Sequence, residues 1–162
     1  MIRTVCALAA LLAAGCAQVE IRPDLRELEF ELTGRLAAST RTEAFTGNLI
    51  WRHARGADEL LISTPLGQGV ARIQRQGDAV LLSTADRREY RAADVELLTE
   101  RVLGFRLPLT GLADWVRGKP SPALEARGWK IEYQEHDAER RPIRMRLNYP
   151  GIELRLAVSE WK

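Results

Sequence analysis

The sequence predicts a mainly β protein: one strongly curved antiparallel sheet or part-barrel, with two helices over its concave face. Two observations predict this class. Apolar and polar residues alternate with a period of two from about residue 30 to residue 92 and again after residue 128, which is typical of half-buried antiparallel strands. Between these stretches the period lengthens to that of a helix. A sheet of this size must curl, and its apolar face needs a cover that the helices can supply.

Length and composition suit one domain with a sizeable core. The chain has 162 residues, of which 46% are hydrophobic and 28% are charged. The formal net charge is only +2, which argues against a nucleic-acid partner held by bulk charge. The chain shows no repeat and no low-complexity segment.

Residues 1–15 are expected to be a signal peptide that is excluded from the fold. A short positive start precedes the apolar run Val5–Ala14, which at about ten residues is too short to span a bilayer. The small residues before Cys16 resemble a bacterial lipobox. Once the signal is removed, Cys16 is the only cysteine and has no partner for an internal disulfide. We therefore expect Cys16 to carry lipid; the alternative is an ordinary secretory signal with a chance cysteine.

Residues 16–29 are expected to form the lipidated cysteine and a tether, and residues 30–162 a single β domain. The tether is polar and is interrupted by Pro23. Its end, 24–28, is a candidate for a short helix. The alternating runs that follow predict strands over 30–39, 45–52, 58–63, 69–76, 79–84 and, as a short return strand, 88–92.

The turn between the third and fourth predicted strands carries an apolar residue at its tip. Thr64 precedes a proline and is therefore pushed toward extended geometry. Pro65 suits position i+1 of a type I turn and Gly67 suits position i+3. Leu66 then occupies position i+2, the most exposed part of the turn, where a polar residue or glycine is usual.

Two helices and three strands complete the predicted order. Apolar residues at helical spacing predict a helix over 93–103, which Gly104 can end. Pro108 opens a second helix, and residues 118–122, rich in proline and glycine, predict a loop. Alternation then predicts strands over 128–136, 143–149 and 152–161.

No arrangement of residues in the sequence supports catalysis or metal binding. His53 and His136 have no cysteine or second histidine at metal-ligand spacing, so surface or structural roles are expected. The chain has no phosphate-binding loop, dinucleotide fingerprint or nucleophile elbow. We therefore expect a protein that is not an enzyme and needs no cofactor.

Five short motifs follow one another along the chain: Phe45-x-Gly47-Asn48-Leu49-x-Trp51, Thr64-Pro65-Leu66-Gly67, Leu103-Gly104-Phe105-x-Leu107-Pro108-Leu109, Leu112-x-x-Trp115-Val116-x-Gly118 and Gly128-Trp129-x-Ile131-x-Tyr133. Together, on a chain with a lipobox, they resemble the LolB family of outer-membrane lipoproteins. Their order and spacing fit from residue 30 to the C-terminus. The resemblance implies a LolA/LolB-like fold, a half-open antiparallel β-barrel with a helical lid over a hydrophobic cavity.

The resemblance also implies a function. Such a protein accepts lipoproteins from the periplasmic carrier LolA into the cavity and inserts them into the outer membrane without a nucleotide or metal. It would act as a monomer, held by its N-terminal lipid on the periplasmic face of the outer membrane of a Gram-negative bacterium, with lipoprotein acyl chains as ligands. The alternative is an outer-membrane-anchored scaffold, or a peptide- or lipid-binding lipoprotein, that shares only the fold.

Two sets of site residues follow from the resemblance. The loop Pro65, Leu66 and Gly67 would contact the membrane through Leu66, unless Leu66 folds back onto the sheet edge. One leucine gains only about half a kcal/mol in a bilayer, so it can orient the protein but cannot anchor it. The expected cavity lining consists of alternating apolar residues of the strands and helices: Leu36, Leu49, Trp51, Ile62, Leu98, Val102, Leu112, Trp115, Ile131, Tyr133, Met145 and Leu147. The alternative for each of these residues is that it belongs to a filled hydrophobic core and lines no cavity.

Overall fold

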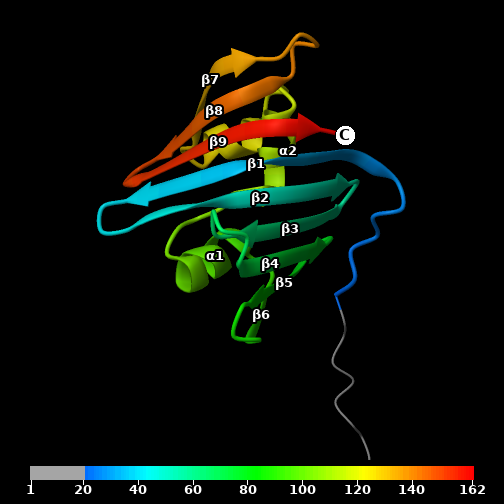
Figure 1. Ribbon diagram of the computed structural model, residues 1–162, viewed down its shortest axis with the longest axis vertical. Coiled ribbons are helices and arrows are strands. Elements are labelled where there is room, and N and C mark those ends of the chain that lie inside the picture. Colours follow the sequence, from blue (N-terminus) through cyan, green and yellow to red (C-terminus); the bar gives the residue numbers. More distant parts are fainter. Residues whose placement is uncertain (1–20) are drawn as a thin grey trace, which may run out of the picture.

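The computed structural model describes residues 21–162, in which nine antiparallel strands form one sheet with helices over one face (Figure 1). The strands are β1 (Leu28–Thr40), β2 (Ala44–Ala54), β3 (Ala57–Ser63), β4 (Gly69–Gln76), β5 (Ala79–Thr84), β6 (Glu89–Ala92), β7 (Lys130–His136), β8 (Pro142–Tyr149) and β9 (Ile152–Trp161). Their spatial order is β6-β5-β4-β3-β2-β1-β9-β8-β7. Because β6 and β7 do not pair with each other, the barrel is half-open, as predicted.

The predicted strands are confirmed, each to within two residues at its ends. In the centre of the sheet β1 pairs with β2 on one side and with β9 on the other. Leu32, Leu36 and Ala38 of β1 are buried, while Arg35 between them is exposed. The period of two therefore separates an apolar inner face from a polar outer face, as strand geometry requires.

The predicted turn at the β3–β4 hairpin is confirmed. The backbone N–H of Gly67 donates to the carbonyl oxygen of Thr64 at 2.8 Å, which closes a four-residue turn. Gly67 has a φ of +85°, a conformation that favours glycine. Leu66 is 91% exposed and does not fold back onto the sheet.

The helices lie on the concave side of the sheet (Figure 1). They are α1 (Val95–Leu103), α2 (Leu109–Val116) and α3 (Pro122–Ala126), and we call them, with their links, the lid. The Asp94 side chain accepts a hydrogen bond from the N–H of Leu97 and starts α1, and Gly104, at a φ of +81°, ends it. In α2 the backbone is non-helical at Thr110 and Gly111, so the regular turn starts after them.

Two local predictions were wrong. The sequence predicted a loop over 118–122 and no helix between it and the next strand, and so missed α3, which has Pro122 in its first turn and buries Leu124. Proline at a helix start is a known signal, but one buried leucine gives no periodicity. The short helix predicted for 24–28 does not form. Asp24 instead pairs with Arg26, and the segment runs on into β1.

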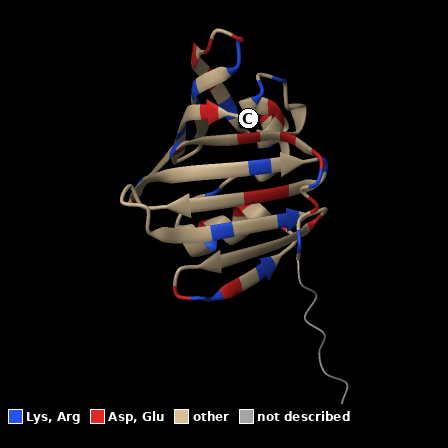
Figure 2. Cartoon of the chain, turned by 45° about the vertical axis from the view of Figure 1, so that its right-hand side comes forward, with Lys and Arg blue, Asp and Glu red and all other residues tan. Residues whose placement is uncertain are grey.

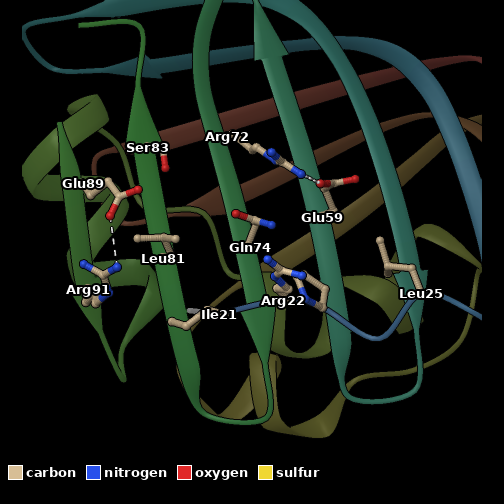
Figure 3. A pocket seen from close by; sticks show the side chains of 11 residues that line it. Ile21, Arg22, Leu25, Glu59, Arg72, Gln74, Leu81, Ser83, Glu89 and Arg91 are labelled. Atoms are coloured by element: carbon tan, nitrogen blue, oxygen red, sulfur yellow. Dashed lines mark hydrogen bonds and ion pairs between the residues drawn. The ribbon is translucent and has the colours of Figure 1, made fainter. Parts of the chain in front are cut away.

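Residues 21–27, which we call the tether segment, lie across the outer face of the sheet (Figure 3). Ile21 is only 8% exposed and, with Pro23 and Leu25, borders a groove of about 680 Å³ that Leu81 also lines. The backbone N–H of Asp24 donates to the side chain of Gln76 at 2.7 Å. The expected signal peptide and Cys16 lie outside the described residues.

Acidic and basic residues are interspersed along the strands of the sheet (Figure 2). Arg52 on β2 bonds to Glu31 on β1 at 2.7 Å and to Glu59 on β3 at 3.2 Å, and Arg72 on β4 bonds to the same Glu59 at 2.9 Å. Cross-strand pairs of opposite charge stabilise neighbouring strands modestly. They also prevent a large patch of either positive or negative charge from forming on this face.

Candidate functional site

The interior between the sheet and the lid is apolar and almost completely filled. A cavity of about 10 Å³ remains at its centre, hardly enough for one water molecule. Nine residues line it: Leu36, Leu49, Trp51, Leu60, Leu107, Leu112, Leu147, Leu154 and Leu156. In this conformation the interior is closed and has no room for a ligand.

Twelve residues were expected to line the cavity, and five of them do so: Leu36, Leu49, Trp51, Leu112 and Leu147. Ile62, Leu98, Trp115 and Met145 are buried in the surrounding core, and Val102, Ile131 and Tyr133 pack against that core while partly exposed. The prediction did not include Leu60, Leu107, Leu154 and Leu156. The alternation of the strand 152–161 was the signal available for the last two.

Few hydrogen bonds from side chains hold the lid in place. The hydroxyl of Thr99, which is fully buried on α1, accepts a hydrogen bond from the N–H of Leu107 at 2.9 Å and fixes the link to α2. The hydroxyl of Tyr133 on β7 donates to the carbonyl oxygen of Trp115 on α2 at 2.8 Å. Burial raises the pKa of Tyr133 above its usual range, with a smaller contribution from the charge of Glu125.

Nε1 of Trp129 donates to the carboxylate of Glu96 on α1 at 3.3 Å. Arg117, at the end of α2, pairs with Glu29 on β1. The rest of the contact between the lid and the sheet is mainly apolar packing.

A second, open pocket of about 310 Å³ lies at one end of the barrel, and we call it the mouth. The β1–β2 hairpin and the link between α1 and α2 form it, with the lining residues Ala38, Thr40, Glu43, Ala44, Phe45, Leu103, Gly104 and Phe105. The rings of Phe45 and Phe105 stack there with centroids 5.8 Å apart and planes 25° apart. The mouth is thus an apolar opening with a polar rim.

The Leu66 loop lies beside the mouth. The side-chain amide of Asn48 on β2 donates to the carbonyl oxygen of Thr64 at 3.2 Å, at the start of the loop. The β1–β2 and β3–β4 hairpins close at the same end of the sheet, because Asn48 pairs with Ser63 at the end of β3. The exposed leucine and the apolar opening therefore share one end of the molecule.

A buried polar cluster occupies the opposite end. The carboxylate of Asp58 is fully buried and accepts hydrogen bonds from Nε1 of Trp51 at 2.8 Å and Nε of Arg75 at 2.6 Å. Nδ1 of His53 lies 2.6 Å from the same carboxylate. Every member has a partner, so His53 has a structural role.

Between residues 21 and 162 no group of histidine, cysteine and carboxylate side chains is arranged to hold a metal ion. In the same part of the chain, none of the helices has the length and apolar character needed to cross a membrane.

The fold and the site together define a class of protein. Its members have a half-open antiparallel barrel with a helical lid over an apolar interior. The chain belongs to the outer membrane lipoprotein LolB family, whose profile matches residues 28–161. The family predicted from the sequence motifs is therefore confirmed. The family is named for a lipoprotein and not for a catalytic activity.

Relatives from several bacteria support the assignment, and each is named outer-membrane lipoprotein LolB. The protein of Thiobacillus denitrificans is 37% identical over 146 residues, which cover 81% of this chain and 78% of that protein. The protein of Nitrosomonas europaea is 34% identical, with 89% and 77% covered. The protein of Chromobacterium violaceum is 35% identical over the whole of both chains.

Proposed function

We propose that this protein receives lipoproteins from the periplasmic carrier LolA and inserts them into the outer membrane, as a monomer and without catalysing a covalent step. Acyl chains leaving a carrier must stay out of water, at about 0.8 kcal/mol for each methylene. Transfer without nucleotide then requires that affinity rise from carrier to receptor to bilayer. An apolar interior under a movable lid supplies the middle affinity.

One observation carries the proposal: an apolar opening and a 91% exposed leucine lie together at one end of the barrel. The Leu66 side chain points into solvent and contributes nothing to the core. A membrane-contacting loop of Pro65, Leu66 and Gly67 explains it. The loop would bring the mouth to the lipid surface at the moment of release.

The anchor belongs to the same proposal. Lipid on Cys16 would hold the domain to the periplasmic face of the outer membrane, and two or more acyl chains make such an anchor effectively permanent. Leu66 adds about half a kcal/mol and would set orientation only. Anchoring and orientation are thus separate tasks carried by different residues.

A second candidate function is favoured by the closed interior. A cavity of about 10 Å³ fits a scaffold lipoprotein, which needs no ligand. Receptor activity requires that the lid move away from the sheet when an acyl chain arrives. The cavity-lining residues proposed from the sequence would then meet the ligand only in the open state.

The two candidates differ in a transfer experiment. The soluble domain from Ala17 onward is incubated with a complex of the carrier and an acylated lipoprotein, and is then pulled down. A receptor acquires the lipoprotein from the carrier. If a folded domain acquires none, the scaffold function is the better explanation.

A further inference from the structure

The mouth and the closed interior are consecutive along the same elements. On β1, Ala38 lines the mouth and Leu36, two residues earlier, lines the interior. On the link between α1 and α2, Phe105 lines the mouth and Leu107 lines the interior. Residues two apart on a strand point to the same face, so the mouth leads directly toward the interior along β1.

Two stacked aromatic rings lie at the mouth, next to the interior. On β2 the Phe45 ring leans over Gly47, toward the interior residue Leu49: a Cβ at Gly47 would lie 2.6 Å from Cζ of Phe45, so the ring needs a glycine there. The same ring stacks on Phe105, which is 3% exposed. Phe45 itself is only partly buried and borders solvent at the mouth.

We propose that Phe45 and Phe105 form an aromatic gate through which the acyl chains of a lipoprotein enter and leave the interior. The inference rests on the proposed receptor function and adds to it the route and the residues that control it. In the closed state the Phe45 ring lies over Gly47 and blocks the passage. An arriving acyl chain displaces this ring and separates it from Phe105.

The opposite end of the barrel is unsuited to this role. There the buried carboxylate of Asp58 is bonded to Arg75, Trp51 and His53. An acyl chain that entered from that end would separate a buried charged pair, which is strongly unfavourable. At the mouth it meets only apolar side chains behind a polar rim.

The position of the gate also fits delivery to a bilayer. Gly47 lies against the carbonyl oxygen of Ser63, the residue before the Leu66 loop begins, and Asn48 bonds to Thr64. A loop that touches the lipid surface would therefore place the gate next to the same surface. An acyl chain could then pass from the interior to the bilayer without crossing water.

The test measures how fast the soluble domain takes up a lipopeptide. The probe is a palmitoylated cysteine peptide with a fluorophore on its lysine, presented as monomers in a stopped-flow instrument. The Phe45→Ala variant is expected to take it up about two- to tenfold faster, the range that an aromatic stack of ordinary strength represents. Phe105→Leu removes the other ring and is expected to accelerate uptake as well.

Two comparisons separate a gate from a general loosening of the fold. The double variant of Phe45→Ala and Phe105→Leu should be no faster than the faster single variant, because both remove the same contact. The matched control is Phe30→Ala, at the other end of the barrel, where Phe30 packs on Trp51 and Trp161. It removes the same ring from a buried site and should leave the uptake rate unchanged.

Each outcome has a definite meaning. Uptake by Phe45→Ala at the wild-type rate, or equal acceleration by Phe30→Ala, would overturn the gate while leaving the receptor function intact. If the folded wild-type domain takes up no lipopeptide at all, the proposed function itself fails, and the gate with it. Circular dichroism on each variant shows whether it is folded.

Discussion

Leu66 is the residue whose exposure is hardest to explain by stability. It is 91% exposed at the tip of a closed turn, and no core contact depends on it. We expect Leu66→Glu to leave folding and lipopeptide uptake unchanged but to lower delivery to liposomes at least about tenfold, because a carboxylate is expelled from the bilayer. Delivery is measured as the lipoprotein that floats with the liposomes.

The matched control for this variant is Leu97→Glu. Leu97 lies on α1 and is also exposed, at 54%, but it is not part of the β3–β4 turn. Delivery by this control should stay at the wild-type level. Equal loss in both variants would indicate a general effect of added charge and would remove Leu66 from the mechanism.

Single carboxylates paired with arginines give the fold a dependence on acid. The hydrogen bond from Arg52 holds the pKa of Glu31 below its usual range, and Arg117 does the same for Glu29. A lowered folded-state pKa contributes stability above the unfolded pKa, near 4.5 for these groups, and this contribution is lost as pH falls through the folded value. We expect the free energy of unfolding to decrease below about pH 4.5.

Urea unfolding at neutral and acidic pH measures this decrease. The Glu31→Gln variant is the appropriate comparison, because it keeps the shape of the side chain and removes the titrating group. Its stability should fall less between neutral and acidic pH than that of the wild type. An identical fall in both proteins would show that Glu31 does not contribute to the acid dependence.

Among the elements, the link between α1 and α2 depends on one hydroxyl. Thr99 is fully buried, and its oxygen is the acceptor for the N–H of Leu107. Thr99→Val keeps the shape of the side chain but leaves that N–H without a partner, which should cost about 1–3 kcal/mol in the free energy of unfolding. Thr42→Val, in the exposed β1–β2 turn, is the control and should cost little. A loss no larger than that of the control would mean that the link is held by packing alone.

The strands were predictable from sequence, whereas the lining of the cavity was predictable only in part. Alternation shows which face of β3 a residue points to, and both Leu60 and Ile62 are buried on that face. Only Leu60 reaches the residual cavity, because the position of the lid decides how deep each side chain lies. Lid placement depends on contacts between distant segments, such as Tyr133 with Trp115, which no local pattern contains.

The aromatic gate illustrates the same limit. Phe45 and Phe105 both stand in the motifs that identified the family, but their contact joins segments far apart in the chain. From the sequence alone, Gly47 is a glycine inside a strand, which usually weakens the strand because it has no side chain to pack. Only the three-dimensional structure shows that its missing side chain makes room for a ring.

At the scale of the whole molecule, the contacts that hold the tether segment to the sheet are set against the conformational entropy lost when the segment is ordered. Burying Ile21 and covering Leu81 contribute about 1.5–3 kcal/mol each. The bond from Asp24 to Gln76 adds about 1 kcal/mol. Fixing the seven backbone residues of the tether segment costs about 7–14 kcal/mol, which is at least as large as these gains, so docking is weak and easily reversed.

Release of this segment would change the reach of the proposed anchor. Five peptide units join Cys16 to Ile21, and twelve join Cys16 to Leu28, where β1 begins. The maximum span rises from about 18 Å to about 42 Å when the segment leaves the sheet. For comparison, the eight residues of β4 extend about 26 Å. Only the released tether is therefore long enough to reach from one end of β4 to the other.

The Ile21→Ser variant tests how the segment is held. Ile21 loses most of its apolar contact with the groove, so we expect the backbone N–H groups of Asp24 and Arg26, which are hydrogen-bonded in the docked segment, to exchange with deuterium at the rate of an unfolded chain, while β5 stays protected. The control is Leu61→Ser, because Leu61 lies on the outer face of β3 but does not line the groove. Strong protection of the Asp24 and Arg26 amides in Ile21→Ser would show that polar contacts hold the tether segment, and that Ile21 does not set the length of free chain available to the anchor.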